Sequence, residues 1–192
     1  MYDLILANFA RHVHLNEDEQ QAVIDRLQPK TYQRREKVLN AGGICKAISF
    51  VVKGCLRMYH TDDDANEHIV NFFAESWWAA DVASLYSQKP AFYAIDALED
   101  TDVLRLGIGA LEELYSFSPK FERFFRILTQ NGFVVYQRRM SWAISRPAKD
   151  RYHYFQKLFP DLEQRIAQKY IASYLGITPE FLSTMKKQKA KR

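Results

Sequence analysis

The stretch YIASYLGITPEFLSTMKK, residues 170–187, holds the side chains whose types and spacing are best suited to binding a partner. Gly176 separates two short helix-forming runs, at a position that requires a left-handed turn residue. Thr178, Pro179 and Glu180 then make a strong helix start, with a capping hydroxyl, a proline at the first position and an acid in the first turn. The pattern predicts two short helices joined by a tight turn.

The apolar and polar residues of this stretch fall on opposite faces of the two predicted helices. The residues expected to face inward are small or aliphatic: Ile171, Ala172, Leu175, Leu182 and Met185. This is the pattern of a helix-turn-helix, whose second helix enters the major groove of DNA. The candidate DNA contacts, which supply hydrogen bonds and phosphate-neutralising charges, are Gln168, Lys169, Thr178, Pro179, Glu180, Phe181, Ser183, Thr184, Lys186 and Lys187. An ordinary helical hairpin is the alternative interpretation.

The distribution of charge also favours a polyanionic partner at this end of the chain. Residues 146–192 hold 11 Lys and Arg against 4 Asp and Glu, a net charge of +7, whereas residues 1–145 hold 16 against 19, a net charge of −3. A basic unit on an acidic body is typical of proteins that bind nucleic acid. The alternative is a solvated basic tail, because 4 of the 11 positive charges lie in residues 187–192.

The remaining residues carry no catalytic or cofactor-binding pattern. There is no GxSxG, P-loop or CxxC motif, and two cysteines, Cys45 and Cys55, cannot hold a four-thiolate iron–sulfur cluster. We therefore predict a protein that is not an enzyme and that uses no cofactor or metal. The rival hypothesis is a cupin-like metal site on His60, Glu67 and His68, but no HxH with a following Glu occurs among the predicted strands.

The residues that precede this C-terminal stretch predict helices first and strands after them. Apolar residues recur every three or four positions through residues 1–29, which predicts helices. Residues 30–108 read as short strands with polar turns, which predicts a sandwich or small barrel. We expect a hairpin at Lys53–Gly54 and further turns at 61–67 and 99–102. No signal peptide or membrane span is recognisable, so a cytoplasmic location without a membrane partner is expected.

A long helix is predicted over residues 119–145, after a short one over 109–117. Ser118 and Pro119 form its start, and Pro147 closes it at a domain boundary. Apolar residues at near-heptad spacing favour packing against a twin helix in a homodimer; they are Phe121, Phe124, Leu128, Val135 and Trp142. The alternative is that this stripe packs on the strands of its own chain.

The order of these elements resembles the Crp/Fnr family of transcription regulators. The resemblance is sharpest in RYHYFQKLFPDLEQRIAQKYIASYLGITPEFLS, residues 151–183, which is similar to a branch common in Bacteroidetes. It implies an α+β fold: an N-terminal helical region and an antiparallel β-roll (a double-stranded β-helix of jelly-roll type), a long dimerisation helix and a C-terminal helix-turn-helix. The implied domains are a cyclic-nucleotide-binding-like effector domain (1–117), a dimerisation helix and hinge (118–146) and a DNA-binding domain (147–192). Double-stranded DNA, a second copy of the chain and a small-molecule effector are the implied partners.

The resemblance also shows where this chain departs from the family. In members that bind cyclic AMP, a glutamate meets the ribose hydroxyl and an arginine meets the phosphate. The matching positions, and the candidate effector pocket, are Ala80, Asp81, Val82, Ala91 and Phe92. Asp81 keeps an acid, but no arginine is present, and a buried phosphate without a charged partner is costly. We predict that the chain does not bind cyclic AMP in the usual way. The aromatic residues that fill the pocket instead, or line one for an apolar effector, are Trp77, Trp78, Phe92 and Tyr93; filling is the preferred interpretation.

Two further departures concern the DNA. Relatives commonly carry a guanine-reading arginine where this chain has Thr184, so the family's base preference does not transfer. Only five residues follow Lys187, so we expect no β-wing, with the basic tail contacting phosphates in its place. A protein-interaction module with a degenerate helix-turn-helix is therefore a second hypothesis.

Overall fold

The computed structural model describes residues 1–190, and side chains as far as Lys187; the tail predicted to contact phosphates lies beyond these described side chains. The helices are α1 (Asp3–Ala10), α2 (Glu17–Arg26), α3 (Val82–Ser87), α4 (Ile108–Phe117), α5 (Pro119–Ser145), α6 (Ala148–Leu158), α7 (Leu162–Arg165), α8 (Gln168–Leu175) and α9 (Pro179–Ala190). The strands are β1 (Gln28–Tyr32), β2 (Lys37–Leu39), β3 (Ala47–Lys53), β4 (Leu56–Thr61), β5 (Glu67–Phe73), β6 (Trp78–Ala79), β7 (Ala94–Ala97) and β8 (Thr101–Gly107).

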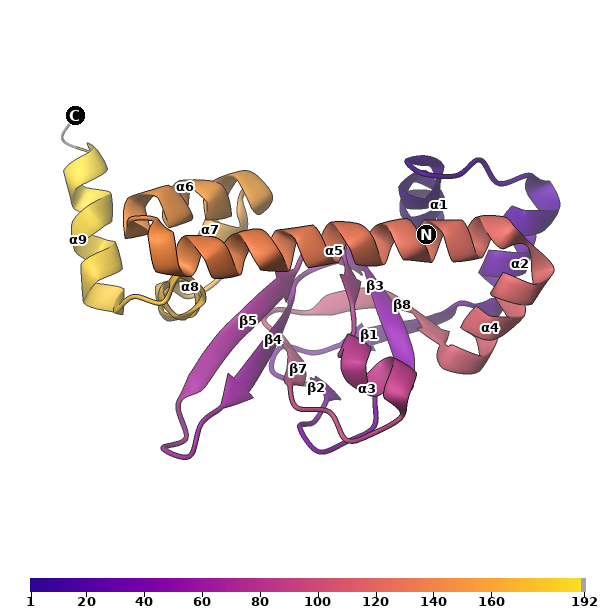
Figure 1. Ribbon diagram of the computed structural model, residues 1–192, viewed down its shortest axis with the longest axis horizontal. Coiled ribbons are helices and arrows are strands. Elements are labelled where there is room, and N and C mark those ends of the chain that lie inside the picture. Colours follow the sequence, from indigo (N-terminus) through magenta and orange to yellow (C-terminus); the bar gives the residue numbers. More distant parts are fainter. Residues whose placement is uncertain (191–192) are drawn as a thin grey trace.

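Helix α5 runs along one side of the molecule and links its two ends (Figure 1). Helices α1, α2 and α4 lie at one end of it, α6 to α9 lie at the other, and the strands occupy the space below its middle (Figure 1). This confirms the predicted α+β order of helical region, β-roll, long helix and C-terminal helices. Within residues 1–190, no helix combines the length and the apolar character needed to cross a bilayer.

The strands form two antiparallel sheets that face each other across the main core. One has the order β1-β8-β3-β6 and the other the order β2-β7-β4-β5. Phe50 and Leu104 from the first sheet and Leu56 and Ile95 from the second are buried in the same hydrophobic cluster. The two layers confirm the sandwich or small barrel predicted from the alternation of short apolar runs and polar turns.

The hairpin predicted at Lys53–Gly54 is wrong, because the strands on either side of it belong to different sheets. Strand β3 ends in the first sheet, and β4 begins at Leu56 in the second. Gly54 makes the crossing with a φ of +94°, and a Cβ atom there would lie 2.5 Å from Thr101 Oγ1. Only glycine fits this conformation and this close approach.

The other two predicted turns differ in kind. Residues 61–67 contain the turn of a true hairpin, since β4 and β5 pair antiparallel and Asp62 N donates to Asn66 O (3.0 Å). Residues 99–102 connect β7 to β8, which again lie in different sheets, and β8 already begins at Thr101. Alternation of polar and apolar residues therefore located strands but did not identify their partners.

The helices predicted within residues 1–29 are present as α1 and α2, but Gln28–Tyr32 forms a strand that includes the proline at its second position. Helix α2 starts with a capping box between Asn16 and Glu19. Glu19 also accepts hydrogen bonds from Ser118 Oγ (2.8 Å) and Lys120 Nζ (2.7 Å). Burial would raise the pKa of Glu19, but these bonds outweigh it and lower the pKa. The carboxylate thus ties α2 to the start of α5.

Helix α5 has the predicted bounds, but its first half packs inside the chain. Phe121 and Phe124 are fully buried, with ring centroids 6.0 and 4.1 Å from that of Phe9. Their assignment to a dimer seam is therefore wrong. A seven-residue period shows that a helix buries a stripe, but not whether the partner is another copy or the chain's own core.

The second half of α5 leaves a different apolar stripe uncovered. Leu128 packs against the main core, and Trp142 contacts Tyr154 with a centroid distance of 4.9 Å, so the rest of the predicted seam is partly covered by its own chain. The large hydrophobic side chains that α5 exposes are Phe133, Val134, Tyr136, Met140 and Ile144.

The C-terminal helices follow the predicted order, with α6 ending before Pro160 and α8 beginning at Gln168. Helix α7 is a single turn. Asp161 precedes it with a φ of 64°, and its side chain makes no capping hydrogen bond. A left-handed aspartate can make this turn at low cost, and the chain changes direction there.

Candidate nucleic-acid interface

The turn between α8 and α9 has the geometry that the sequence predicted. Gly176 closes α8 in the left-handed conformation, with a φ of 65°. Gly176 N donates to Ser173 O and Ile177 N donates to Ala172 O, each at 3.1 Å, which is the hydrogen-bond pattern of a Schellman motif. The next helix starts where Thr178 Oγ1 accepts from the backbone N–H of Phe181 at 3.2 Å.

The predicted inner face of the two helices is buried. Four of its five residues have little or no exposed surface: Ile171, Ala172, Leu175 and Leu182. The fifth, Met185, is partly buried against the same cluster. The small side chain of Ala172 is fully buried at this crossing, so a larger side chain there would push the helices apart. These residues fix the position of α9 relative to α8.

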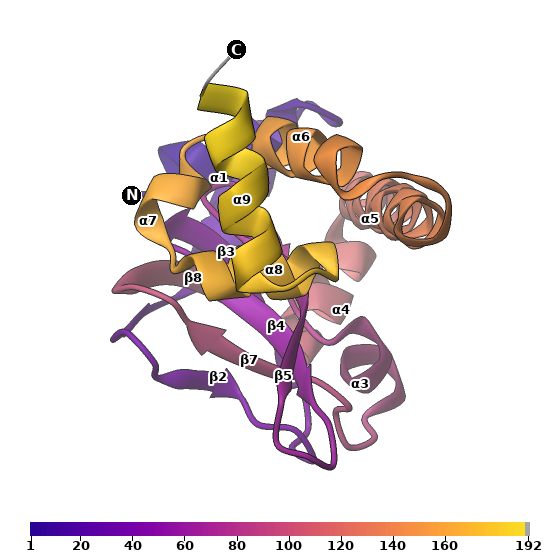
Figure 2. The ribbon, with the colours of Figure 1, turned by 90° about the vertical axis from the view of Figure 1, so that its left-hand side faces the viewer.

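Most of the predicted DNA contacts are exposed to solvent. The residues that are exposed are Gln168, Lys169, Thr178, Pro179, Glu180, Phe181, Thr184 and Lys187, while Ser183 and Lys186 are half-buried. Helix α9 forms the outer surface at this end of the molecule, with α8 beneath it against the strands (Figure 2). The first turn of α9 is therefore accessible to a large partner.

Two of the predicted contacts are already engaged within the chain. Lys186 forms an ion pair with Glu163 of α7. Burial would raise the pKa of Glu163, but its hydrogen bonds with Lys186, Tyr152 and Gln156 lower the pKa. Thr184 Oγ1 donates to Glu180 O at 3.0 Å, which leaves this hydroxyl free only to accept. Lys169 and Lys187 are the exposed lysines of this surface.

Helices α6 to α9 share a hydrophobic core with the outer face of the second sheet. This interdomain core contains Phe72 of β5, whose ring centroid lies 6.1, 5.8 and 5.3 Å from those of Phe155, Phe159 and Tyr174. Trp77 adds a further contact, with its ring 5.1 Å from that of Phe159. The apolar contacts are continuous, so the C-terminal helices are docked on the β-roll rather than loosely tethered to it.

Arg139 of α5 is a polar clamp at the edge of this core. Its guanidinium donates to the carbonyl oxygens of Ile69 and Tyr174, both at 2.9 Å, and also to that of Val70. It lies 4.0 Å from the centroid of the Tyr174 ring. Burial lowers the pKa of Arg139, although the residue stays charged at neutral pH. One side chain thus joins α5, β5 and α8.

Two more polar contacts cross the same boundary. Ser173 Oγ accepts from Ile69 N (2.9 Å) and donates to Glu67 O (3.1 Å). Arg165 pairs with Glu75 at 2.8 Å and with Glu99. Burial would raise the pKa of Glu75, but Arg165 outweighs it and lowers the pKa. Sequence reasoning predicted none of these contacts, because no local pattern marks contacts between positions that lie 35 to 106 residues apart.

Most residues of the predicted effector cassette are buried or form hydrogen bonds within the chain. Asp81 caps α3, accepting from Ser84 N at 3.0 Å, and also accepts from Tyr93 N at 3.3 Å. Ala80 and Ala91 are buried, and the backbone of Ala91 pairs with the loop at Gly43. The one carboxylate of the cassette, that of Asp81, therefore already accepts hydrogen bonds from two backbone N–H groups.

Phe92 does not fill a pocket, so the preferred interpretation of that residue is wrong. Its side chain is 61% exposed and stacks on His60, with 4.3 Å between the ring centroids. Val82, the remaining cassette residue, lines a cavity of about 390 Å³ between the β-roll and α5. Trp77 and Trp78 also line this cavity, whose walls are mainly apolar.

The residues of the rival metal site do not converge. His68 Nε2 lies 2.7 Å from Asp62 Oδ2, Glu67 pairs with Arg57, and His60 stacks on Phe92. Among residues 1–190, no three His, Cys, Asp or Glu side chains are grouped closely enough to hold a metal ion. The geometry gives the cupin-like hypothesis no support.

Comparison with known proteins identifies the class of the β-roll. Residues 29–116 match the family described as "Cyclic nucleotide-binding domain". No match is found among curated proteins. The resemblance recognised in the sequence is thereby confirmed for this domain.

Solved structures of other proteins, regulators among them, share the fold over most of the chain. FixK2 from Bradyrhizobium japonicum has a TM-score of 0.74 at 20% identity, covering 84% of this chain and 83% of that one. The c-di-GMP-responsive global regulator CLP from Xanthomonas campestris has a TM-score of 0.70 at 15% identity, covering 92% and 93%. A Crp/Fnr-family regulator from Eubacterium rectale has a TM-score of 0.67 at 18% identity, covering 89% and 82%. Residues 29–116 thus form a roll that matches the cyclic-nucleotide-binding domain, and the chain shares its fold with solved regulators, one of which belongs to the Crp/Fnr family.

Proposed function

We propose that this chain is a cytoplasmic DNA-binding transcription regulator that acts as a homodimer. The observation that carries the proposal is the unit of α8, the Gly176 turn and α9, with its inner face buried and the first turn of α9 exposed. The net charge of +7 on residues 146–192 and the fold shared with regulators support it. Residues 1–117 would be the effector domain, 118–146 the dimerisation helix and hinge, and 147–192 the DNA-binding domain.

Selection of bound sequences from random DNA tests this function. We expect a two-fold-symmetric motif, because a dimer places two recognition helices on two half-sites. Lys187→Gln should weaken binding to all sequences alike and reduce the salt dependence by about one counterion, because it removes a phosphate contact. Lys53→Gln, an exposed lysine on the roll, is the matched control and should leave binding unchanged. Failure to bind any fragment at low salt would favour the interaction module with a degenerate helix-turn-helix.

We further propose that the effector domain does not bind cyclic AMP in the usual way. The cassette offers the buried carboxylate of Asp81, already engaged by two backbone N–H groups, and no arginine at Ala91 or Phe92 for the phosphate. An anion brought there would lack a charged partner. Calorimetric titration with cyclic AMP is expected to show no heat of binding, and a dissociation constant in the micromolar range would overturn the proposal.

A further inference from the structure

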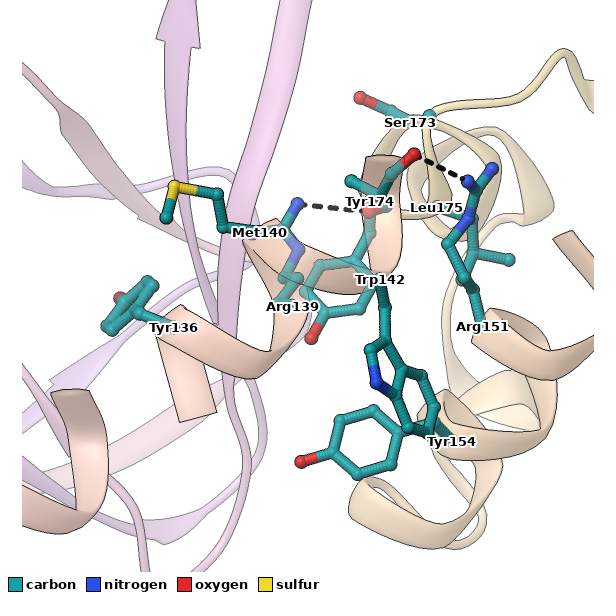
Figure 3. Close-up of a pocket in the computed structure, with 11 residues that line it drawn as sticks. Tyr136, Arg139, Met140, Trp142, Arg151, Tyr154, Ser173, Tyr174 and Leu175 are labelled. Atoms are coloured by element: carbon teal, nitrogen blue, oxygen red, sulfur yellow. Dashed lines mark hydrogen bonds between the residues drawn. The ribbon is translucent and has the colours of Figure 1, made fainter. Parts of the chain in front are cut away.

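A second cavity lies at the junction of α5, α6 and α8, away from the cassette. Its volume is about 270 Å³, and it is bounded by the second half of α5, by Arg151 and Tyr154 of α6 and by the end of α8 at Gly176 (Figure 3). It therefore touches both the long helix and the turn that sets the position of α9. We call it the hinge pocket.

Two arginines of the hinge pocket carry charges that no carboxylate neutralises within residues 1–190. Arg139 donates to carbonyl oxygens, among them that of Tyr174 (Figure 3). Arg151 donates to the carbonyl oxygens of Ala143 (3.1 Å) and Arg146 (3.3 Å). Arg151 Nε is buried and has no hydrogen-bond partner in this part of the chain. A buried donor without an acceptor is costly, and so is a desolvated cation without a counter-charge. An anion in the pocket would supply the counter-charge that both guanidinium groups lack.

The walls of the hinge pocket are largely aromatic. The rings of Tyr136, Trp142, Tyr154 and Tyr174 line it, and those of Trp142 and Tyr154 lie 4.9 Å apart at 57°. Such rings favour a flat apolar ligand through stacked and edge-to-face contacts. A cavity of about 150 Å³ suffices for benzene, so the hinge pocket has room for a ring bearing a carboxylate.

We propose that the hinge pocket binds a small planar aromatic anion, with its ring between the aromatic side chains and its carboxylate at Arg151. Arg139 contributes positive charge from the opposite wall, while its hydrogen bonds hold α5 against β5 and α8. The ligand would contact α5, α6 and α8 at once. The site is independent of the cyclic-nucleotide cassette, and its binding can be measured without DNA.

Titration calorimetry of the full-length protein with salicylate and indole-3-carboxylate tests the proposal. We expect at least one of them to bind once per chain with a dissociation constant below about 1 mM. The corresponding amide, which keeps the ring and lacks the charge, should bind about tenfold more weakly or worse, the size of effect expected for a hydrogen bond to a charged group.

Variants locate the binding. Arg151→Gln should weaken it by about tenfold or more, as should Ala143→Leu, which fills part of the pocket and removes no side-chain hydrogen bond. Arg126→Gln is the matched control, since this exposed arginine of α5 bonds only to Gln130 among the described contacts and should leave binding unchanged. Absence of binding by both carboxylates, equal binding of the amides, or full binding by both pocket variants would each overturn the proposal, whether or not the chain binds DNA.

Discussion

Replacing Phe72 by alanine is expected to lower the free energy of unfolding by about 3–5 kcal/mol, the usual cost of truncating a buried phenylalanine. The side chain has no exposed surface, and its ring contacts are with Phe155, Phe159 and Tyr174 of the C-terminal helices. The cavity would therefore open between the roll and those helices. Urea unfolding gives the total loss, and hydrogen exchange shows where protection is lost.

The expected pattern is faster exchange in α6 and α8, with α1 and α2 little changed. The matched control is Phe181→Ala, which removes the same atoms from a side chain that is 54% exposed on α9. Its effect should be within about 0.5 kcal/mol. A loss below about 1 kcal/mol for Phe72→Ala, or a loss of protection spread evenly over the chain, would contradict the docked arrangement.

The features predicted correctly from the sequence are those that neighbouring residues determine. The start of α5 follows from Ser118 and Pro119, and the α8–α9 turn follows from Gly176 and Thr178, because caps and left-handed turns are local chemistry. The hairpin at Gly54 was predicted wrongly because its structure depends on residues that are distant in the sequence. Which sheet a strand joins depends on residues far along the chain, here Thr101 against Gly54.

The docking of the C-terminal helices could not be predicted for a related reason. Ser173 reads as an ordinary polar position of α8, yet its hydroxyl bonds to the backbone at Ile69 and Glu67. Arg139 reads as a surface residue of a charged helix, yet it bonds to three backbone carbonyl oxygens of β5 and α8. Such side chains show their role only when two distant segments meet, so sequence patterns located the candidate interface but not what holds it in place.

The exposed apolar stripe on the second half of α5 predicts where the dimer interface lies. Met140 and Ile144 are 65% and 86% exposed, and with Phe133 they are spaced by seven and four residues, which places them on one helix face. Exposed apolar side chains in such a row mark an interaction surface. We propose that this face, rather than the buried Phe121 and Phe124, meets the twin helix in the dimer.

Met140→Glu combined with Ile144→Glu is therefore expected to yield a monomer. Four carboxylates would face one another across the two-fold axis without water to solvate them. Sedimentation equilibrium should give a mass of 22.5 kDa for the variant and twice that for the wild type. Affinity for a two-fold-symmetric DNA site should fall by about a hundredfold or more, because the second half-site contact is no longer intramolecular.

Phe117→Glu provides the matched control, because it adds a carboxylate at an aromatic residue of α4 that is similarly exposed. It should leave both the mass and the DNA affinity unchanged. A double variant that remains dimeric would exclude this face of α5 as the seam. A monomeric variant with undiminished DNA affinity would show that one recognition helix suffices, and it would remove the physical reason to expect a palindromic site.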